Sequence, residues 1–120
     1  MKYRRNSERN KLTDAILAEI KRIKLKKYPR CVQCGSTYNL QLGHVFTRNY
    51  KSTIFEMDNN FIQCEVHNNE HENNPEPYIS WVKNEIGERR YMLLLGKTYL
   101  IKKWQIWELK ELLEKLRSMD

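Results

Sequence analysis

Two short motifs constrain this 120-residue chain more than any other feature. Cys31-x-x-Cys34 and Cys64-x-x-His67 each place two soft metal ligands with two residues between them, the usual spacing of a zinc knuckle. Residues 35–37 (Gly-Ser-Thr) favour a turn after the first pair, whereas a redox Cys-x-x-Cys normally opens a helix. We therefore expect one structural zinc ion held by Cys31, Cys34, Cys64 and His67.

Two details of the cysteine pattern complete this prediction. Three cysteines are an odd number, and no apolar export signal follows the N-terminal charges, so a disulfide framework is not expected. A reduced thiol cluster without metal is the alternative. His71 lies one helical turn after His67 and could replace it as the fourth ligand.

The length and hydropathy of the chain predict a single small domain, residues 1–120. The hydrophobic share is 40% and the mean hydropathy is −0.81, so we expect a small hydrophobic core that a bound metal ion would help to stabilise. The longest apolar run, residues 91–95, is far shorter than the roughly 18 residues that span a bilayer. We expect a soluble, cytoplasmic protein.

Charge points to a polyanionic partner. Lys and Arg number 22 against 15 Asp and Glu, which gives a net charge of +7. Residues 1–30 carry 11 basic and 3 acidic side chains, residues 31–78 carry 2 and 6, and residues 79–120 carry 9 and 6. A basic helix is often only a solvated face. The other interpretation is that these basic residues bind nucleic acid, and the contacts we predict are Arg4, Arg5, Lys24, Lys26, Lys27 and Arg48.

The predicted elements give an α+β fold. Apolar residues at helical spacing predict a helix over 7–27, which Tyr28-Pro29 ends. Two short strands are expected around 40–46 and 61–63, followed by helices over 64–73, 77–86 with Gly87 as C-cap, 88–95, and 98–118. The last would be about 30 Å long. Its apolar stripe either packs on the first helix or forms a dimer seam.

The segment between the knuckles is where chemistry is expected. It is longer than the dozen or so residues of a ββα zinc finger, so it has room for a site. It contains His44 and Asn59, and Asn68 directly follows the second knuckle. The chain has no glycine-rich phosphate loop and no Gly-x-Ser-x-Gly motif, which argues against a nucleotide-binding loop and a serine hydrolase.

The order His, Asn, Asn around two knuckles resembles a known family. Residues 31–78 are similar to the NinG (Rap) phage recombination proteins, within the HNH or ββα-metal nuclease superfamily, and to endonuclease VII-type junction resolvases. The matching pieces are Cys31-Val32-Gln33-Cys34-Gly35, Leu42-Gly43-His44, Phe55, Asn59, Gln63-Cys64, Asn68 and Pro77-Tyr78. The resemblance implies a zinc-stapled ββα core (31–78) between a basic N-terminal helix (1–30) and C-terminal helices (79–120).

The resemblance also implies roles for individual residues. His44 would be the general base, and Asn59 would tie the loop and orient His44. Asn68 would bind a catalytic Mg²⁺ or Mn²⁺ ion. Independently of the resemblance, Glu72 lies four residues on along the same helix face and is a candidate for a second ligand. Two departures stand out: His67 where the family usually has Cys, and Gly43 where endonuclease VII-like enzymes have a metal-binding Asp.

The expected function is metal-dependent endonuclease cleavage of branched, Holliday-junction-like DNA in phage recombination. The resemblance places the protein in the cytoplasm of a phage-infected or prophage-carrying bacterial host. Two symmetric cuts would suit a homodimer. The alternatives are a non-catalytic, zinc-stabilised nucleic-acid-binding protein and an interaction protein whose last helix docks a partner.

Overall fold

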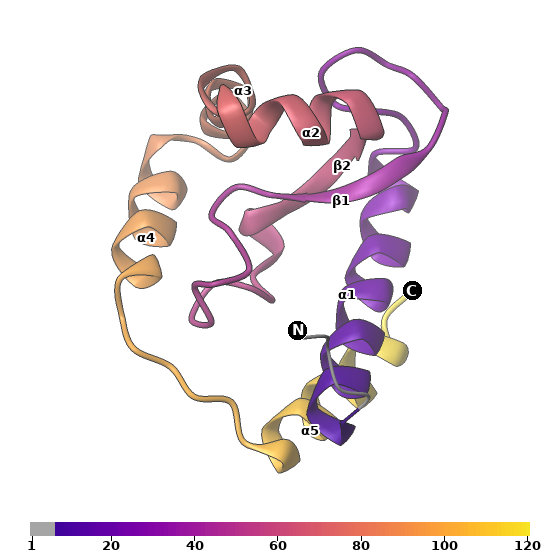
Figure 1. Ribbon diagram of the computed structural model, residues 1–120, viewed down its shortest axis with the longest axis vertical. Helices are drawn as coiled ribbons and strands as arrows, with labels where there is room; N and C mark the ends of the chain where they lie inside the picture. Colours follow the sequence, from indigo (N-terminus) through magenta and orange to yellow (C-terminus); the bar gives the residue numbers. More distant parts are fainter. Residues whose placement is uncertain (1–6) are drawn as a thin grey trace, which may run out of the picture.

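The computed structural model describes residues 7–120 as five α-helices, a single 3₁₀ turn and two strands (Figure 1). In chain order they are α1 (Glu8–Lys27), β1 (Leu40–His44), the 3₁₀ turn η1 (Met57–Asn59), β2 (Asn60–Cys64), α2 (Glu65–Asn73), α3 (Glu76–Ile86), α4 (Glu88–Thr98) and α5 (Ile106–Arg117). The α+β class predicted from the sequence is confirmed. No helix of the described residues is long and apolar enough to cross a membrane.

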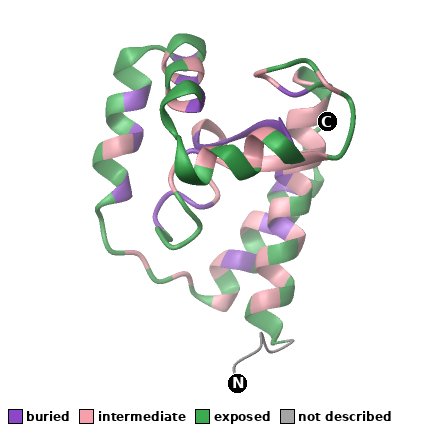
Figure 2. Cartoon of the chain, turned by 45° about the horizontal axis from the view of Figure 1, so that its top comes forward, coloured by how far each residue is buried: buried purple, intermediate pink, exposed green. Residues whose placement is uncertain are grey.

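β1 and β2 form an antiparallel hairpin at the centre of the molecule. Leu40 pairs with Cys64 and His44 pairs with Asn60, so the register is continuous over both strands. All five residues of β2 are buried, because helices cover the hairpin on several sides (Figure 2). α2 begins directly after β2 and lies across the hairpin (Figure 1). Together they form a ββα unit.

α1 starts and ends where the sequence predicts. The hydroxyl of Ser7 accepts a hydrogen bond from the backbone N–H of Asn10 at 3.1 Å, which is the usual N-cap contact. The helix ends at Lys27, and Tyr28 leaves the helical region before Pro29. The predicted boundaries of α2 and α3 are confirmed to within one residue, and Gly87 ends α3 with a positive φ of 88°.

Two hydrophobic clusters hold the helices to the hairpin. The first lies between the hairpin, α3 and α4 and contains Val45, Phe61, Tyr78, Val82, Ile86, Tyr91 and Leu94. The second joins α1 to α5 through Ile16, Ile20, Leu109, Leu113 and Leu116. Of the two predicted partners for the last helix, the structure therefore shows the N-terminal helix of the same chain. Arg22 reinforces this pairing by donating to the carbonyls of Leu116 at 3.0 Å and Met119 at 2.9 Å.

The predicted helix over 98–118 is wrong at its start. Thr98 is the last residue of α4, which passes through Gly96 without ending, and α5 begins only at Ile106. The Thr98 hydroxyl donates to the carbonyl of Leu94 at 2.8 Å and so belongs to α4. A capping box formed by Gln105 and Glu108 starts α5 instead. The last helix is consequently about 18 Å long, and residues 99–105 form a non-helical connector.

Candidate functional site

The four predicted zinc ligands come together in the structure. One donor atom from each of Cys31, Cys34, Cys64 and His67 lies within 4.8 Å of all the others. The Sγ atoms of Cys34 and Cys64 are 3.8 Å apart, and the Sγ of Cys64 is 3.4 Å from Nδ1 of His67. A tetrahedron with Zn–S bonds near 2.3 Å and a Zn–N bond near 2.0 Å has edges of about 3.8 and 3.5 Å. The cluster could therefore hold a zinc ion.

Local structure explains how the two knuckles form. Gly35 has a φ of 76° and its N–H donates to the Cys31 carbonyl at 2.8 Å, which closes the first knuckle as a turn. Cys64 ends β2 and caps α2, so His67 in the first turn of that helix faces back toward the sulfurs. The helix start therefore fixes the second knuckle.

The Cys31 thiol is prepared for metal binding. Burial raises its pKa, but hydrogen bonds from the backbone of Cys64 and Gln33 outweigh this effect and lower the pKa to about 7. Zinc binds the thiolate, so a lowered pKa reduces the cost of losing the proton.

His71, the alternative fourth ligand, lies outside the cluster. Its ring packs against Tyr78 with the ring centroids 4.7 Å apart, and it contacts the backbone of Val45. Partial burial lowers its pKa. His67 therefore completes the Cys₃His group, and His71 instead joins α2 to the end of β1.

His44 is the last residue of β1 and is half-buried, with its Nδ1 atom shielded from solvent. Burial lowers the pKa of the imidazole to about 4, and the nearby Arg48 guanidinium acts in the same direction, while the Asn60 amide opposes both. Among the described residues, Nδ1 of His44 and Oδ1 of Asn60 are both buried without a hydrogen-bond partner. These two residues pair across the hairpin.

Asn59 ties the loop that follows β1. Its Oδ1 accepts from the backbone N–H of Phe46 at 2.8 Å, and its Nδ2 donates to the carbonyl of the same residue at 3.0 Å. The side chain is fully buried. Its neighbour Asn60 donates to the carbonyls of Ile54 and Glu56 at 3.0 and 2.7 Å. Both asparagines therefore brace the segment that carries His44 to β2.

Asn68 lies on the face of α2 that meets β1. Its Nδ2 donates to Oε1 of Gln41 at 2.8 Å, so Oδ1 of Asn68 takes no part in this hydrogen bond. Glu72, four residues later, is exposed. Within residues 7–120, none of the side chains of His44, Asn59 and Asn68 is hydrogen-bonded to another of the three. The three residues lie on three different segments of the ββα unit: the end of β1, the turn before β2, and α2.

Gly43 is a glycine for a steric reason. A Cβ atom built on it would lie 1.9 Å from Oε1 of Gln63, far closer than any real contact. Gln63 is fully buried, its Nε2 donates to Gln33 at 2.6 Å, and its Oε1 has no hydrogen-bond donor among the described residues. The amide of Gln63 thus fills the space that a side chain at position 43 would need.

The predicted nucleic-acid contacts are spread over two regions. Lys26 is exposed, and Lys27 lies 4.0 Å from the carboxylate of Glu85. Lys24 packs over the Phe61 ring at 3.7 Å, and burial lowers its pKa to about 8. Arg48 lies in the loop after β1, 3.7 Å from Asp14. Arg4 and Arg5 are outside the described residues.

Sequence reasoning missed Asn60 and Gln63. Asn60 was hidden by its neighbour, since two consecutive asparagines read as a turn. Gln63 stands two residues from Phe61, the residue that pairs with Gly43 in the structure, and so lies on the same sheet face as Gly43. Neither position could be assigned until the hairpin register was known.

Comparison with known proteins adds the family. The model of the family described as bacteriophage lambda NinG protein matches residues 1–119, which includes the ββα unit and the helices on both sides of it. No curated protein and no solved structure matches the chain. The family match covers nearly the whole sequence, and the chain therefore belongs to the bacteriophage lambda NinG protein family.

Proposed function

We propose that this protein is a metal-dependent DNA endonuclease of the HNH type that cuts branched DNA in phage recombination. One observation carries the proposal: a Cys₃His group staples an antiparallel hairpin to a helix, with His44 where the first strand ends, Asn59 in the return loop and Asn68 on the helix. The HNH constellation requires these residue types in this order on a ββα unit.

His44 would act as the general base. With a pKa near 4 its imidazole is neutral at pH 7 and can accept a proton from water. We assign its Nδ1–H to the unpaired Oδ1 of Asn60, an assignment that satisfies both buried atoms and leaves Nε2 as the base. A DNA phosphate beside the ring would raise the pKa again, since a negative charge favours the protonated imidazole.

Asn59 would position the base without touching substrate. Its two hydrogen bonds to the backbone of Phe46 hold the loop two residues after His44. A loop fixed at this point keeps the end of β1 in one conformation, and a general base is effective only at a fixed distance from its water.

A catalytic divalent ion would be bound between β1 and α2. Amide oxygens suit Mg²⁺ and Mn²⁺, and Oδ1 of Asn68 is left available because the amide of this residue uses Nδ2 to bind Gln41. Such an ion would supply positive charge against the charge that develops on the phosphate.

The test compares three labelled DNAs: a four-way junction, a flap and a linear duplex, each with added Mg²⁺ or Mn²⁺ and without added divalent ion. We expect cleavage of the branched DNAs that needs the divalent ion. The His44→Ala protein, purified in the same way, controls for contaminating nuclease. Branched DNA that is bound tightly but never cut, with either ion, would contradict the proposal and favour a non-catalytic zinc-stabilised nucleic-acid-binding protein.

A further inference from the structure

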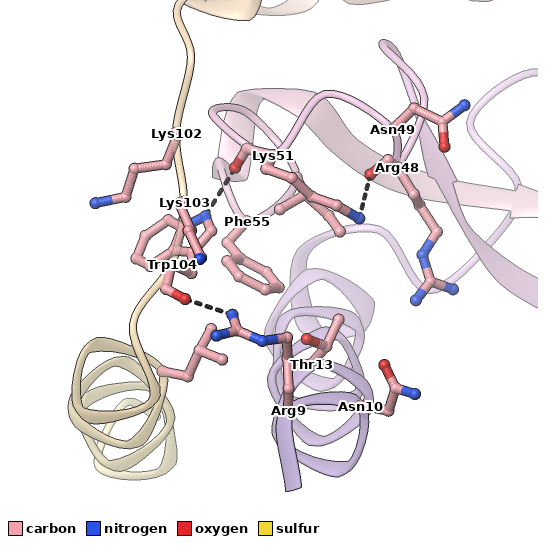
Figure 3. A pocket seen from close by; sticks show the side chains of 12 residues that line it. Arg9, Asn10, Thr13, Arg48, Asn49, Lys51, Phe55, Lys102, Lys103 and Trp104 are labelled. Atoms are coloured by element: carbon pink, nitrogen blue, oxygen red, sulfur yellow. Dashed lines mark hydrogen bonds between the residues drawn. The ribbon is translucent and has the colours of Figure 1, made fainter. Parts of the chain in front are cut away.

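A pocket of about 540 Å³ lies beside the ββα unit and has no role in the function proposed above. It is formed by the first turns of α1, the loop after β1 and the connector that leads into α5 (Figure 3). Small-molecule sites span about 300 to 1,000 Å³. The pocket therefore has room for a nucleotide and is far too small for a duplex.

The pocket is strongly positive. Its lining includes five cations and no carboxylate; the cations are Arg9, Arg48, Lys51, Lys102 and Lys103. Two carboxylates approach from outside: Asp14 lies 3.7 Å from Arg48, and Glu108 lies 2.8 Å from Lys102. Positive charges still outnumber negative ones by five to two. Lys103 is exposed and makes no ion pair within residues 7–120.

Aromatic rings form another wall of the pocket. Phe55 and Trp104 meet edge to face with centroids 5.2 Å apart. The indole N–H of Trp104 donates to the carbonyl of Lys51 at 2.8 Å, and the guanidinium of Arg9 donates to the carbonyl of Trp104 (Figure 3). These contacts join all three segments, so the pocket is built before any ligand arrives. Cations interleaved with fixed aromatic rings are the usual surface for unpaired bases and their phosphates.

The pocket adjoins the proposed catalytic histidine. Arg48 lines it and lies four residues after His44 in the loop that follows β1. The guanidinium is close enough to His44 for its charge to act on the imidazole. A DNA strand whose phosphate reached His44 would therefore meet Arg48 next and then the pocket.

We propose that this pocket binds an unpaired nucleotide of the DNA strand next to the cut. The proposal rests on the proposed function and adds the feature that selects the substrate: a single-stranded segment beside the scissile phosphate. A flap or an opened branch point offers such a segment, whereas linear duplex keeps its bases paired and away from the aromatic wall. A free nucleotide shares the chemistry, and the experiment below separates the two.

The experiment measures binding to the zinc-loaded protein without added Mg²⁺ or Mn²⁺, so that no cleavage is needed. The fluorescence anisotropy of a labelled oligothymidylate of about 12 nucleotides reports binding; unlabelled duplex, thymidine monophosphate and inorganic phosphate are competitors. We expect Lys103→Glu to weaken single-strand binding at least about fivefold. The matched control is Lys115→Glu, the same charge change on an exposed residue at the other end of α5, and it should bind like the wild type.

Trp104 tests the aromatic wall separately. Trp104→Phe keeps a ring but loses the hydrogen bond to Lys51, whereas Trp104→Leu fills space without a π-face. We expect near-normal binding by the first variant and a loss by the second, with circular dichroism showing that both are folded.

Several results would overturn the proposal. These are equal losses in the Lys103 and Lys115 variants, equal losses for duplex and single strand, or thymidine monophosphate competing as well as the oligonucleotide. The proposed function can fail independently of the pocket. A protein that binds the oligonucleotide through Lys103 but never cuts DNA would support the nucleotide-binding pocket and contradict the proposed nuclease function.

Discussion

Asn59 and Asn60 are neighbours in the chain, yet their side chains have different partners. Asn59 holds the backbone of Phe46, and Asn60 holds two carbonyls of the same loop while its oxygen stays unpaired near His44. The resemblance assigned both loop tying and histidine orientation to Asn59. The structure places only the loop contacts there, and the orienting role that we propose belongs to Asn60.

Replacing His44 tests the general base. We expect His44→Ala to cut DNA about 10² to 10⁴ times more slowly, because that is the usual contribution of general base catalysis. DNA affinity and zinc content should be unchanged, since neither the basic residues nor the zinc ligands are altered. Single-turnover cleavage with separate binding measurements would check this. Cleavage at the wild-type rate would remove His44 from the mechanism.

His44 should also make the fold sensitive to acid. Its pKa falls from an unfolded value near 6.5 to about 4, so it contributes stability above pH 6.5 that is lost as the pH falls toward 4. Between about pH 7.5 and about pH 5 the loss should approach about 2 kcal/mol. Urea unfolding of the wild type and of His44→Ala at both pH values isolates this effect, because acid release of zinc affects both proteins equally.

The contact between Gly43 and Gln63 predicts a coupled pair. Gly43→Asp alone should destabilise the protein by about 1 to 3 kcal/mol, because its Cβ would overlap the Gln63 amide. Adding Gln63→Ala should recover most of that stability, because the space taken by the Gln63 amide becomes free for the new side chain. Unfolding of both single variants and of the double variant gives the coupling energy. Additive losses would mean that the two side chains do not compete for the space.

At the scale of elements, the sequence predicted the hairpin, α1, α2 and α3 well because each has a local signal. Ser7 caps α1, Pro29 stops it, and Gly87 separates α3 from α4. The start of α5 had misleading signals. Leu100 and Ile101 extend the apolar stripe, and in the structure they are 64% and 102% exposed in the connector.

The α5 start also shows why the candidate pocket could not be predicted. Once the helix begins at Ile106, Trp104 is free to leave the helical stripe and pack against Phe55, about fifty residues earlier. This contact is tertiary, and no local pattern indicates it. Gln105 and Glu108 form a capping box without the Ser or Thr that usually marks one.

The pairing of α1 with α5 predicts a large cost for one core leucine. Leu109 is 1% exposed and packs with Ile16 and Ile20. Leu109→Ala should lower the free energy of unfolding by about 2 to 5 kcal/mol, the usual range for a buried leucine. Trp107→Ala, at a position that is 64% exposed on the same helix, is the control and should cost far less. Equal losses would contradict the observed face of α5.

At the scale of the whole molecule, we expect the Cys₃His group to decide whether the central unit can fold. It joins the turn after α1 to the start of α2, and β2 lies between them with every residue buried. We expect about one zinc per chain. Cys64→Ser or a strong chelator should abolish cooperative thermal unfolding, because structural zinc sites usually supply folding free energy. A metal-free protein that melts cooperatively at the same temperature would contradict this.

Basic charge at the molecular scale predicts a steep salt dependence. Log affinity for DNA should fall linearly with log salt, because each phosphate contact releases condensed counterions. Reversing the charge of Lys26 and Lys27 should flatten that slope if they contact phosphate. Reversing Lys24, which packs on Phe61, should lower stability as well. An unchanged slope after reversal of Lys26 and Lys27 would indicate that these two residues form a solvated face and do not contact phosphate.

The partnership of α1 and α5 also has a consequence for synthesis on the ribosome. The buried residues that pack with Ile16 and Ile20 lie between positions 109 and 116, almost a hundred residues later in the chain, and Leu42, Phe55 and Met57 add only partly buried contacts. A nascent chain can complete the zinc knuckles and the hairpin long before it contains those leucines. Until then the apolar face of α1 is open to chaperones and to neighbouring chains. Codons that slow translation between the hairpin and α5 should therefore increase aggregation of this protein, because α1 has then left the ribosome and α5 has not yet been made.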